Sequence, residues 1–239
     1  MTTLVLVRHG RSTSNTAGTL AGRTPGIELD ERGRSQAMAV GERLRGVRLD
    51  LAVRSPMLRC EQTLSLALES AAMQPLVVVD EQASECDYGD WSNRALSELA
   101  EEPLWATVQA HPSQVVFPGG ESMTAMAERM SGVVERGNAR AAELAPEGAD
   151  PTWLLVSHGD PIKAVISQAL GQDFDAFQRI MVDPASITLV HYPSGDGKGA
   201  GAPMVIAMNT TEGQVTRRLP QAPAGHGPQL GGGTGSEKP

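Results

Sequence analysis

The sequence predicts an α/β protein in which helices cover both faces of a mostly parallel, mixed sheet. Short apolar segments typical of strands alternate along the chain with longer segments that have apolar residues at helical spacing. Strands followed by helices in this order are typical of a parallel sheet. The chain has 239 residues, of which 40% are hydrophobic, and it is therefore long enough to bury such a core.

The first third of the chain begins this alternation. The apolar run Thr3–Val7 predicts a strand, and residues 31–47 have apolar side chains at helical spacing. Leu51–Val53 is short and apolar, which predicts a second strand. Ser55-Pro56 then has the pattern of an N-cap followed by the first residue of a helix. The β-branched run Leu76–Val79 predicts a short strand buried in the sheet.

The rest of the chain continues the pattern. Residues 95–109 and 121–144 are expected to be helical, and the second of these has a stripe of methionines that indicates core packing. Trp153–Val156 predicts a strand, and Asp160-Pro161 again predicts an N-cap and the start of a helix. The last two strands, Ile187–His191 and Met204–Met208, are expected to pair as a hairpin across the Gly-rich segment Ser194–Pro203.

Composition excludes several classes of protein. The formal net charge is −8 and only 3% of residues are aromatic, which argues against nucleic-acid binding. No apolar run approaches the ~20 residues of a membrane span, and the N-terminus has no secretory signal. We therefore expect a cytoplasmic protein that binds neither nucleic acid nor membrane. Residues 1–59 nevertheless contain ten arginines against five acidic residues, an excess that could serve a small anion.

Two histidines follow predicted strands in the same way. Leu6–Gly10 and Leu155–Gly159 both run from an apolar strand into a His-Gly pair. Ligands of an open parallel sheet bind outside the carboxyl ends of the strands, so His9 and His158 are expected at one edge. A single histidine there is often an ordinary loop residue, but two favour a functional site.

Other strand ends are expected to bring Arg8, Arg59 and a carboxylate to the same edge. Arginine binds phosphate oxygens bidentately, and two arginines with a histidinium would neutralise a phosphoryl dianion. The other imidazole could attack phosphorus, and a protonated carboxylate could supply a proton to the departing alcohol. The five histidines and two cysteines lack the spacing of a zinc site, so we expect no metal and no cofactor.

Five motifs in this order resemble those of the histidine phosphatase superfamily, which includes the cofactor-dependent phosphoglycerate mutases. They are Val7–Asn15, Ser55–Thr63, Glu85 with Tyr88–Trp91, Pro118–Ser122 and Ser157–Gly159. The resemblance covers roughly residues 3–210 and implies a phosphoglycerate mutase-like, three-layer α/β/α fold. It also implies one histidine phosphatase domain over residues 1–219, with an insertion at about 90–145. Residues 220–239 are rich in Gly, Pro and Gln without an apolar period, which predicts a disordered tail.

The resemblance implies a catalytic role for five residues. His9 would be phosphorylated and then hydrolysed, while Arg8, Arg59 and His158 would hold the phosphoryl group. Glu85 would protonate the leaving group, with Asp87 as the nearest rival acid.

Four further residues are expected around the phosphate. Asn15 and the backbones of Gly10 and Gly159 would add hydrogen-bond donors. Ser12 would either contact the phosphate or order the loop.

The sequence favours a metal-independent phosphatase over a phosphoglycerate mutase-like phosphomutase or a non-catalytic module that binds a phosphorylated ligand. The family's mutases bind two phosphates, yet Ser92–Ser122 contains only Arg94 as a basic residue besides His111. The segment Pro118–Ser122 also resembles the phosphatases more closely. We expect a small phosphorylated substrate, and the sequence selects neither among sugars, glycerates, phosphopeptides and nucleotides nor an oligomeric state.

The segment after Trp91 and the two cysteines also bear on the site. The family often has Trp-Glu-Gly where this chain has Trp91-Ser92-Asn93, a change that removes no catalytic atom. Cys60 and Cys86 each neighbour a proposed site residue, and we expect two small buried hydrophobic side chains rather than a redox pair.

Overall fold

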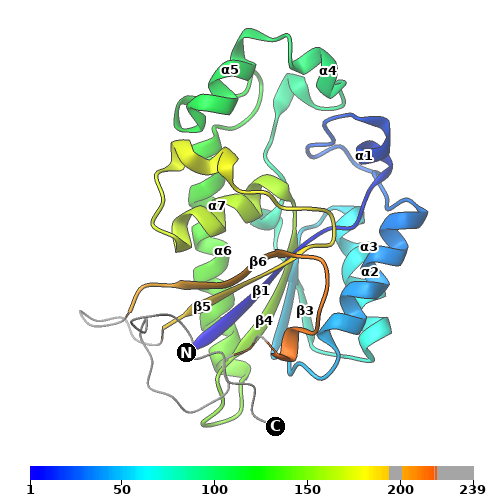
Figure 1. Ribbon diagram of the computed structural model, residues 1–239, viewed down its shortest axis with the longest axis vertical. Coiled ribbons are helices and arrows are strands. Elements are labelled where there is room, and N and C mark those ends of the chain that lie inside the picture. Colours follow the sequence, from blue (N-terminus) through cyan, green and yellow to red (C-terminus); the bar gives the residue numbers. More distant parts are fainter. Residues whose placement is uncertain (194–200, 218, 220–239) are drawn as a thin grey trace.

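The computed structural model describes residues 1–193, 201–217 and 219, and its centre is a six-stranded sheet (Figure 1). The strand order is β3-β2-β4-β1-β5-β6. The strands are β1 (Thr2–Arg8), β2 (Leu51–Arg54), β3 (Leu76–Val79), β4 (Thr152–Ser157), β5 (Ile187–Tyr192) and β6 (Met204–Thr210). Strands β1 to β4 run parallel, whereas β5 pairs antiparallel with both β1 and β6. The predicted mixed sheet and C-terminal hairpin are confirmed.

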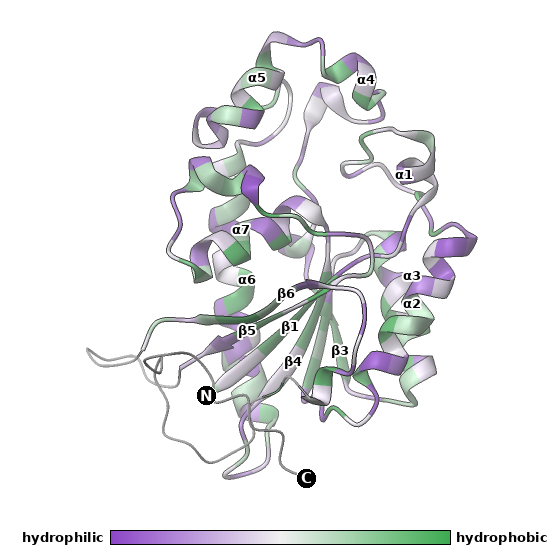
Figure 2. Cartoon of the chain, viewed as in Figure 1, coloured by the Kyte–Doolittle hydropathy of each residue, from purple (hydrophilic) through white to green (hydrophobic). Residues whose placement is uncertain are grey.

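Four helices form the two outer layers. Helices α2 (Glu31–Leu44) and α3 (Leu58–Ala71) cover one face, and α6 (Met123–Leu144) and α7 (Gly159–Ala169) cover the other (Figure 1). Figure 2 shows hydrophobic residues gathered in the strands and hydrophilic patches on the outer sides of α2 and α3. The predicted three-layer α/β/α fold is therefore confirmed.

Alternation along β1 divides the core into two halves. Leu4 and Leu6 pack with side chains of α6 and α7, whereas Val5 and Val7 pack with side chains of α2 and α3. All four are fully buried. Both faces of this central strand are therefore apolar, and polar groups follow only where the strand ends, at Arg8 and His9.

The smaller helices lie mainly around the carboxyl end of the sheet. They are α1 (Thr13–Ala17), α4 (Leu96–Leu99) and α5 (Pro103–Ala110), with short 3₁₀ helices at Glu81–Ala83, Gly89–Trp91, Pro112–Gln114, Phe174–Arg179 and Val215–Arg217. The single helix expected at 95–109 is thus divided, because Pro103 starts a new helix at its first turn. Helix α2 ends at Leu44, three residues before its predicted end, where Arg45 leaves the helical conformation.

Strand β3 differs from expectation in its burial. The sequence predicts a buried strand, but its four side chains are 38 to 47% exposed. β3 is the last strand of the sheet and, among the described residues, pairs only with β2. A run of β-branched residues predicts extended backbone equally well at the edge and in the centre of a sheet, so the pattern could not distinguish them.

Two helix starts also differ from expectation. Helix α3 begins at Leu58 after Met57, and α7 begins at Gly159 after His158, so neither Ser55 nor Asp160 is an N-cap. Ser55 Oγ lies 2.8 Å from His158 Nε2, and Asp160 Oδ2 accepts a 2.8 Å hydrogen bond from the Tyr88 hydroxyl. Both side chains are thus used in the candidate site described below rather than as helix caps.

The methionine stripe of α6 is confirmed as core, since Met123, Met126 and Met130 are all fully buried. Within the described ranges, no helix is both long and apolar enough to cross a membrane. The tail expected at 220–239 and most of the segment Ser194–Pro203 lie outside the described residues. The domain boundary at 219 stays a prediction.

Helix α6 also contains a pair of glycines that tests its packing. A Cβ added at Gly137 would overlap the buried ring of Trp153, whereas one at Gly132 would meet only the flexible end of the Arg136 side chain. We expect Gly137→Ala to lower the free energy of unfolding by about 1–3 kcal/mol through overpacking. Gly132→Ala should raise it by about 0.5–1 kcal/mol, the difference in helix propensity. Urea unfolding of both variants checks this, and equal effects would contradict it.

Candidate active site

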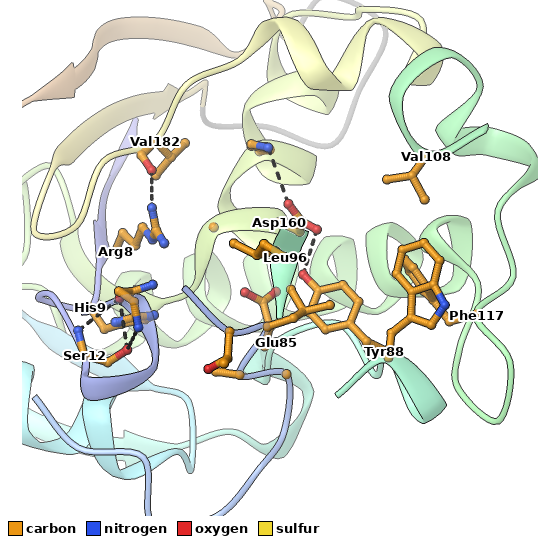
Figure 3. A pocket seen from close by; sticks show the side chains of 18 of the residues that line it. Arg8, His9, Ser12, Glu85, Tyr88, Leu96, Val108, Phe117, Asp160 and Val182 are labelled. Carbon is orange, nitrogen blue, oxygen red and sulfur yellow. Dashed lines mark hydrogen bonds and ion pairs between the residues drawn. The ribbon is translucent and has the colours of Figure 1, made fainter. Parts of the chain in front are cut away.

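A cavity of about 320 Å³ opens where β1 and β4 end (Figure 3). Arg8, His9, Arg59, Glu85 and Gly159 are among the residues that line it. The segment with α4 and α5 contributes Leu96, Trp105 and Val108 to the far wall. The structure thus brings together, from four separate segments, the residues that the sequence placed at one sheet edge.

His9 has its side chain fixed in one tautomer. It is 4% exposed, and its Nδ1 lies 2.7 Å from the carbonyl oxygen of Gly10. A carbonyl only accepts, so Nδ1 must carry the proton and the lone pair is on Nε2. Arg59 Nε donates towards that lone pair at 3.3 Å. The imidazole is therefore oriented as a nucleophile whose reactive nitrogen lies beside a guanidinium.

His158 lies across from His9, with ring centroids 5.3 Å apart. Its Nδ1 accepts from Arg59 Nη2 at 3.0 Å, which leaves Nε2–H to donate to Ser55 Oγ. Burial, followed by the charge of Arg59, holds the pKa of both histidines well below its usual range. The histidinium expected from the sequence is thus disfavoured in this structure, although a phosphoryl dianion would act in the opposite direction.

The two arginines leave donors unused at the bottom of the cavity. Arg8 Nη1 donates to the Val182 carbonyl at 2.7 Å, and Arg59 Nη2 donates to the Gly22 carbonyl at 2.8 Å. Among the described residues, Arg8 Nε and Arg59 Nη1 are buried without a hydrogen-bond partner. Such a group costs about 1–3 kcal/mol or more when charged. A pair of unsatisfied guanidinium donors beside a nucleophile suits a bound anion.

Glu85 has the electrostatic character of an acid donor. Its side chain is buried, and Oε1 accepts from the Cys86 backbone N–H at 2.9 Å. Burial, with the negative charge of Asp160 next in size, raises the pKa of Glu85 to about 7. The rival acid Asp87 is 41% exposed and pairs with Arg23, so the geometry favours Glu85.

A network of charges holds the Glu85 loop in place. Arg23 Nε and Arg129 Nη2 donate to the Glu85 main-chain carbonyl at 2.9 and 3.0 Å. Both arginines also bond Glu121 Oε1, which in addition accepts from the Asp87 backbone N–H. Burial acts to raise the pKa of Glu121, but the hydrogen bonds from Arg129 and Asp87 hold it below its usual range.

The segment Pro118–Ser122, which contains Glu121, packs directly against the Glu85 loop. Gly120 packs so closely on Asp87 that a Cβ would overlap its carbonyl oxygen. The two loops can therefore approach only where glycine is present. The segment Pro118–Ser122 thus positions the Glu85 loop without touching the cavity floor.

The four remaining predicted residues divide into three that line the cavity and one that does not. Ser12, Asn15 and Gly159 line it, and Ser12 also caps α1 in a reciprocal arrangement with Asn15. The expected donor role of Gly10 is contradicted, because its N–H already donates to Thr63 Oγ1 at 3.0 Å. Gly10 instead orients His9 through its carbonyl oxygen.

Several residues of the site were missed from the sequence; of those named here, all but Ser55 line the cavity. Ser55 bonds His158, while Tyr88, Asp160 and Lys163 form one polar group on the wall beyond Glu85. Ser55 and Asp160 lie inside or directly beside the recognised motifs, which was the available signal. Their pattern as N-caps concealed it.

Asn93 stands where the family often has glycine, and its backbone keeps a conformation that suits glycine. Asn93 has a φ of +68°, in the left-handed region where glycine is favoured and asparagine is tolerated.

The two basic residues of the segment Ser92–Ser122 lie away from the cavity. Arg94 forms an ion pair with Glu102 at 2.6 Å, and His111 is 59% exposed beside Asp175. Neither basic group lines the cavity. The insertion therefore brings no cation to the cavity for a second phosphate.

Both cysteines are buried and free, as expected of small hydrophobic side chains. Burial raises the pKa of Cys60 to about 12 and also raises that of Cys86, which disfavours the reactive thiolate. Across the described part of the chain, no group of three or more His, Cys, Asp and Glu side chains is arranged to hold a metal ion.

Comparison with known proteins extends these observations. Residues 4–200 match the model of the histidine phosphatase superfamily (branch 1). Phosphoserine phosphatase 1 of Hydrogenobacter thermophilus is 33% identical over 195 residues, which cover 80% of this chain and 87% of that protein. The probable phosphoglycerate mutase GpmB of Erwinia tasmaniensis is 30% identical over 203 residues, covering 84% of this chain and 90% of that protein.

A solved structure agrees with these matches. A mycobacterial glucosyl-3-phosphoglycerate phosphatase in complex with VO3 is similar at a TM-score of 0.76 and 25% identity, over 87% of this chain and 99% of that one. The predicted resemblance is confirmed both by the family match and by the fold. This chain belongs to branch 1 of the histidine phosphatase superfamily.

Proposed function

We propose that this protein hydrolyses small phosphate monoesters through a phosphohistidine on His9, with Glu85 as the proton donor and without a metal. One observation supports this above the others: two buried guanidinium N–H groups, on Arg8 and Arg59, have no acceptor among the described residues and belong to the arginines at the cavity end that holds His9 Nε2. A phosphoryl group would satisfy both donors and present phosphorus to the imidazole.

The first half-reaction follows from this arrangement. His9 Nε2 attacks phosphorus, and the bond between phosphorus and the alcohol oxygen breaks. Glu85 gives its proton to the departing oxygen. Arg8 and Arg59 stabilise the charge on the equatorial oxygens, and the hydrogen bond from Nδ1 to the Gly10 carbonyl supports the imidazole as it becomes charged.

The second half-reaction returns the enzyme to its starting state. The Glu85 carboxylate takes a proton from water, whose oxygen attacks phosphorus as the P–N bond breaks. Inorganic phosphate leaves, and Glu85 is protonated again. A pKa of about 7 suits both steps, because each form of Glu85 is accessible near neutral pH.

Charge favours a phosphatase over a mutase. Among the described residues, the basic side chains that line the cavity are Arg8, Arg59 and Lys163 besides His9, and Lys163 lies 3.5 Å from Asp160. One phosphoryl dianion balances the two arginines, and the Lys163–Asp160 pair is neutral. A second phosphate would therefore lack a free cation. The relative named as a probable phosphoglycerate mutase keeps the mutase as an alternative.

Similar proteins are named as phosphatases of different substrates, phosphoserine and glucosyl-3-phosphoglycerate among them. They support a small phosphorylated substrate, which also suits a cavity of about 320 Å³. The cytoplasmic location expected from the sequence stays a prediction.

The proposed function is tested by following ³²P from a labelled monoester, with and without EDTA. We expect all label to be released as inorganic phosphate at an unchanged rate in EDTA. Acid-labile, base-stable label should appear on the protein when the reaction is quenched early. Transfer of label to a second hydroxyl would support a mutase, and loss of turnover in EDTA would contradict metal independence. Binding of substrate without turnover would support the non-catalytic alternative.

A further inference from the structure

Asp160 occupies the wall of the cavity next to Glu85 and is held there rigidly. It follows His158-Gly159 directly, at the second residue of α7. Its Oδ2 accepts from the Tyr88 hydroxyl at 2.8 Å, and its Oδ1 lies 3.5 Å from Lys163 Nζ. Its side chain is 19% exposed. Figure 3 shows Glu85 between Arg8 on one side and Tyr88 with Asp160 on the other.

The charged groups around the Glu85 carboxyl shift its protonation equilibrium in opposite directions. Arg8 and His9 come from the end of β1, Arg59 from α3, His158 from the N-cap of α7, and Asp160 and Lys163 from α7 itself. Tyr88 and Cys86 belong to the same segment as Glu85, and Arg23 and Arg129 bond its main-chain carbonyl. The positive charges of Arg59 and Arg8 favour the carboxylate. An ordinary glutamic acid placed between two arginines would be ionised at neutral pH and could donate no proton.

Tyr88 fixes the position of the Asp160 carboxylate in the wall of the cavity. The phenol can donate only one hydrogen bond, and it gives this bond to Asp160 Oδ2. Burial and then the charge of Asp160 raise the pKa of Tyr88 well above its usual range, so it remains a donor. The carboxylate of Asp160 is thereby oriented towards the segment that contains Glu85.

On the basis of the proposed function, we propose that Asp160 is a positioning residue that keeps Glu85 protonated against the two arginines. Although Lys163 lies 3.5 Å from its other oxygen, the carboxylate of Asp160 opposes a second negative charge on Glu85 in the same cavity. Asp160 donates nothing to the substrate itself and acts only through Glu85. The raised pKa of Glu85, to which Asp160 contributes after burial, is consistent with this geometry.

Loss of Asp160 should lower activity to a different extent for substrates with different leaving groups. An alkyl alkoxide or a phenolate is a strong base and needs a proton from Glu85 as it departs, whereas p-nitrophenolate leaves readily without one. Loss of Asp160 should therefore impair phenyl phosphate more than p-nitrophenyl phosphate, and only at pH values where Glu85 becomes ionised.

The test is the pH profile of kcat/KM for phenyl phosphate and p-nitrophenyl phosphate in the wild type and Asp160→Asn. Asparagine keeps the volume and can still accept from Tyr88. We expect the basic limb for phenyl phosphate to move down by about one pH unit, which is about a tenfold loss above that limb. Activity on phenyl phosphate below the limb, and on p-nitrophenyl phosphate throughout, should change less than about threefold. Glu85→Gln should lose phenyl phosphate turnover at every pH.

Asp87→Asn is the matched control, because it removes an acid two residues from Glu85 that lies outside the cavity and pairs with Arg23. Its basic limb should stay at the wild-type position. A ¹³C titration of the Glu85 carboxyl in both folded variants gives the same comparison without turnover. An unchanged Glu85 pKa in Asp160→Asn, or an equal loss with both substrates at every pH, would overturn the proposal. Absence of turnover in the wild type would instead count against the proposed function, and the titration would still decide the role of Asp160.

Discussion

His9→Ala should reduce kcat/KM for any phosphate monoester by about 10⁴-fold or more, the size of effect seen when a covalent nucleophile is removed. The structure gives the reason. His9 Nε2 has the lone pair, to which Arg59 Nε donates only at 3.3 Å, and Nδ1 is committed to the Gly10 carbonyl. His158 does not replace it, because it is fully buried behind Arg59 and, unlike His9, does not line the cavity.

Two measurements check this expectation. Steady-state hydrolysis of p-nitrophenyl phosphate gives the loss of rate, and an early alkaline quench with ³²P-labelled substrate shows whether label remains on the protein. His111→Ala, an exposed histidine beside Asp175, is the control and should keep full activity. Label on the protein or appreciable turnover in His9→Ala would show that another residue is the nucleophile.

Arg59→Ala should reduce kcat/KM by about 10³-fold or more, which is the range for an arginine that stabilises a transferring phosphoryl group. Arg59 is 1% exposed and contacts both histidines. Its Nη1, like Arg8 Nε, is a buried guanidinium donor without an acceptor among the described residues. Removing it deletes charge and hydrogen bonds at the point where the phosphoryl oxygens would lie.

The pH profile provides a second and independent signature of Arg59. Its positive charge lowers the pKa of His9 and of His158, second only to burial. Without it, the pKa of His9 should rise, so the acid limb of kcat/KM should move to higher pH. Arg59→Lys keeps a charge and should retain the wild-type acid limb while losing the bidentate contact and about 10²-fold in rate.

The matched control for this prediction is Arg34→Ala, which removes an exposed arginine that pairs with Glu28 at the surface. It should change neither the rate nor the limb. Circular dichroism confirms that each variant is folded. A folded Arg59→Ala protein with near wild-type kcat/KM would show that the phosphoryl group binds elsewhere.

Much of the fold could be predicted because its signals are local. Apolar runs such as Leu4–Val7 and Trp153–Val156 form strands wherever they occur in a parallel sheet, and their burial on both faces is confirmed. Strand ends in such a sheet meet at one edge, and this placed His9, His158 and the arginines together before any contact was known. Position in the sheet is not local, which is why β3 was expected in the interior and lies at the edge.

The sequence by itself determined the family, the layered fold and four residues that line one end of the cavity, Arg8, His9, Arg59 and Glu85. Those properties depend on the order of motifs and on periodicity, both of which can be read along one chain. Only the tertiary structure decided what each polar side chain contacts. Ser55 and Asp160 have the local pattern of helix caps, yet His158 and Tyr88, distant in sequence, use them instead. Hydrogen bonds and charges act through space, so the protonation of Glu85 and the unsatisfied donors of Arg8 and Arg59 exist only once the chain has folded.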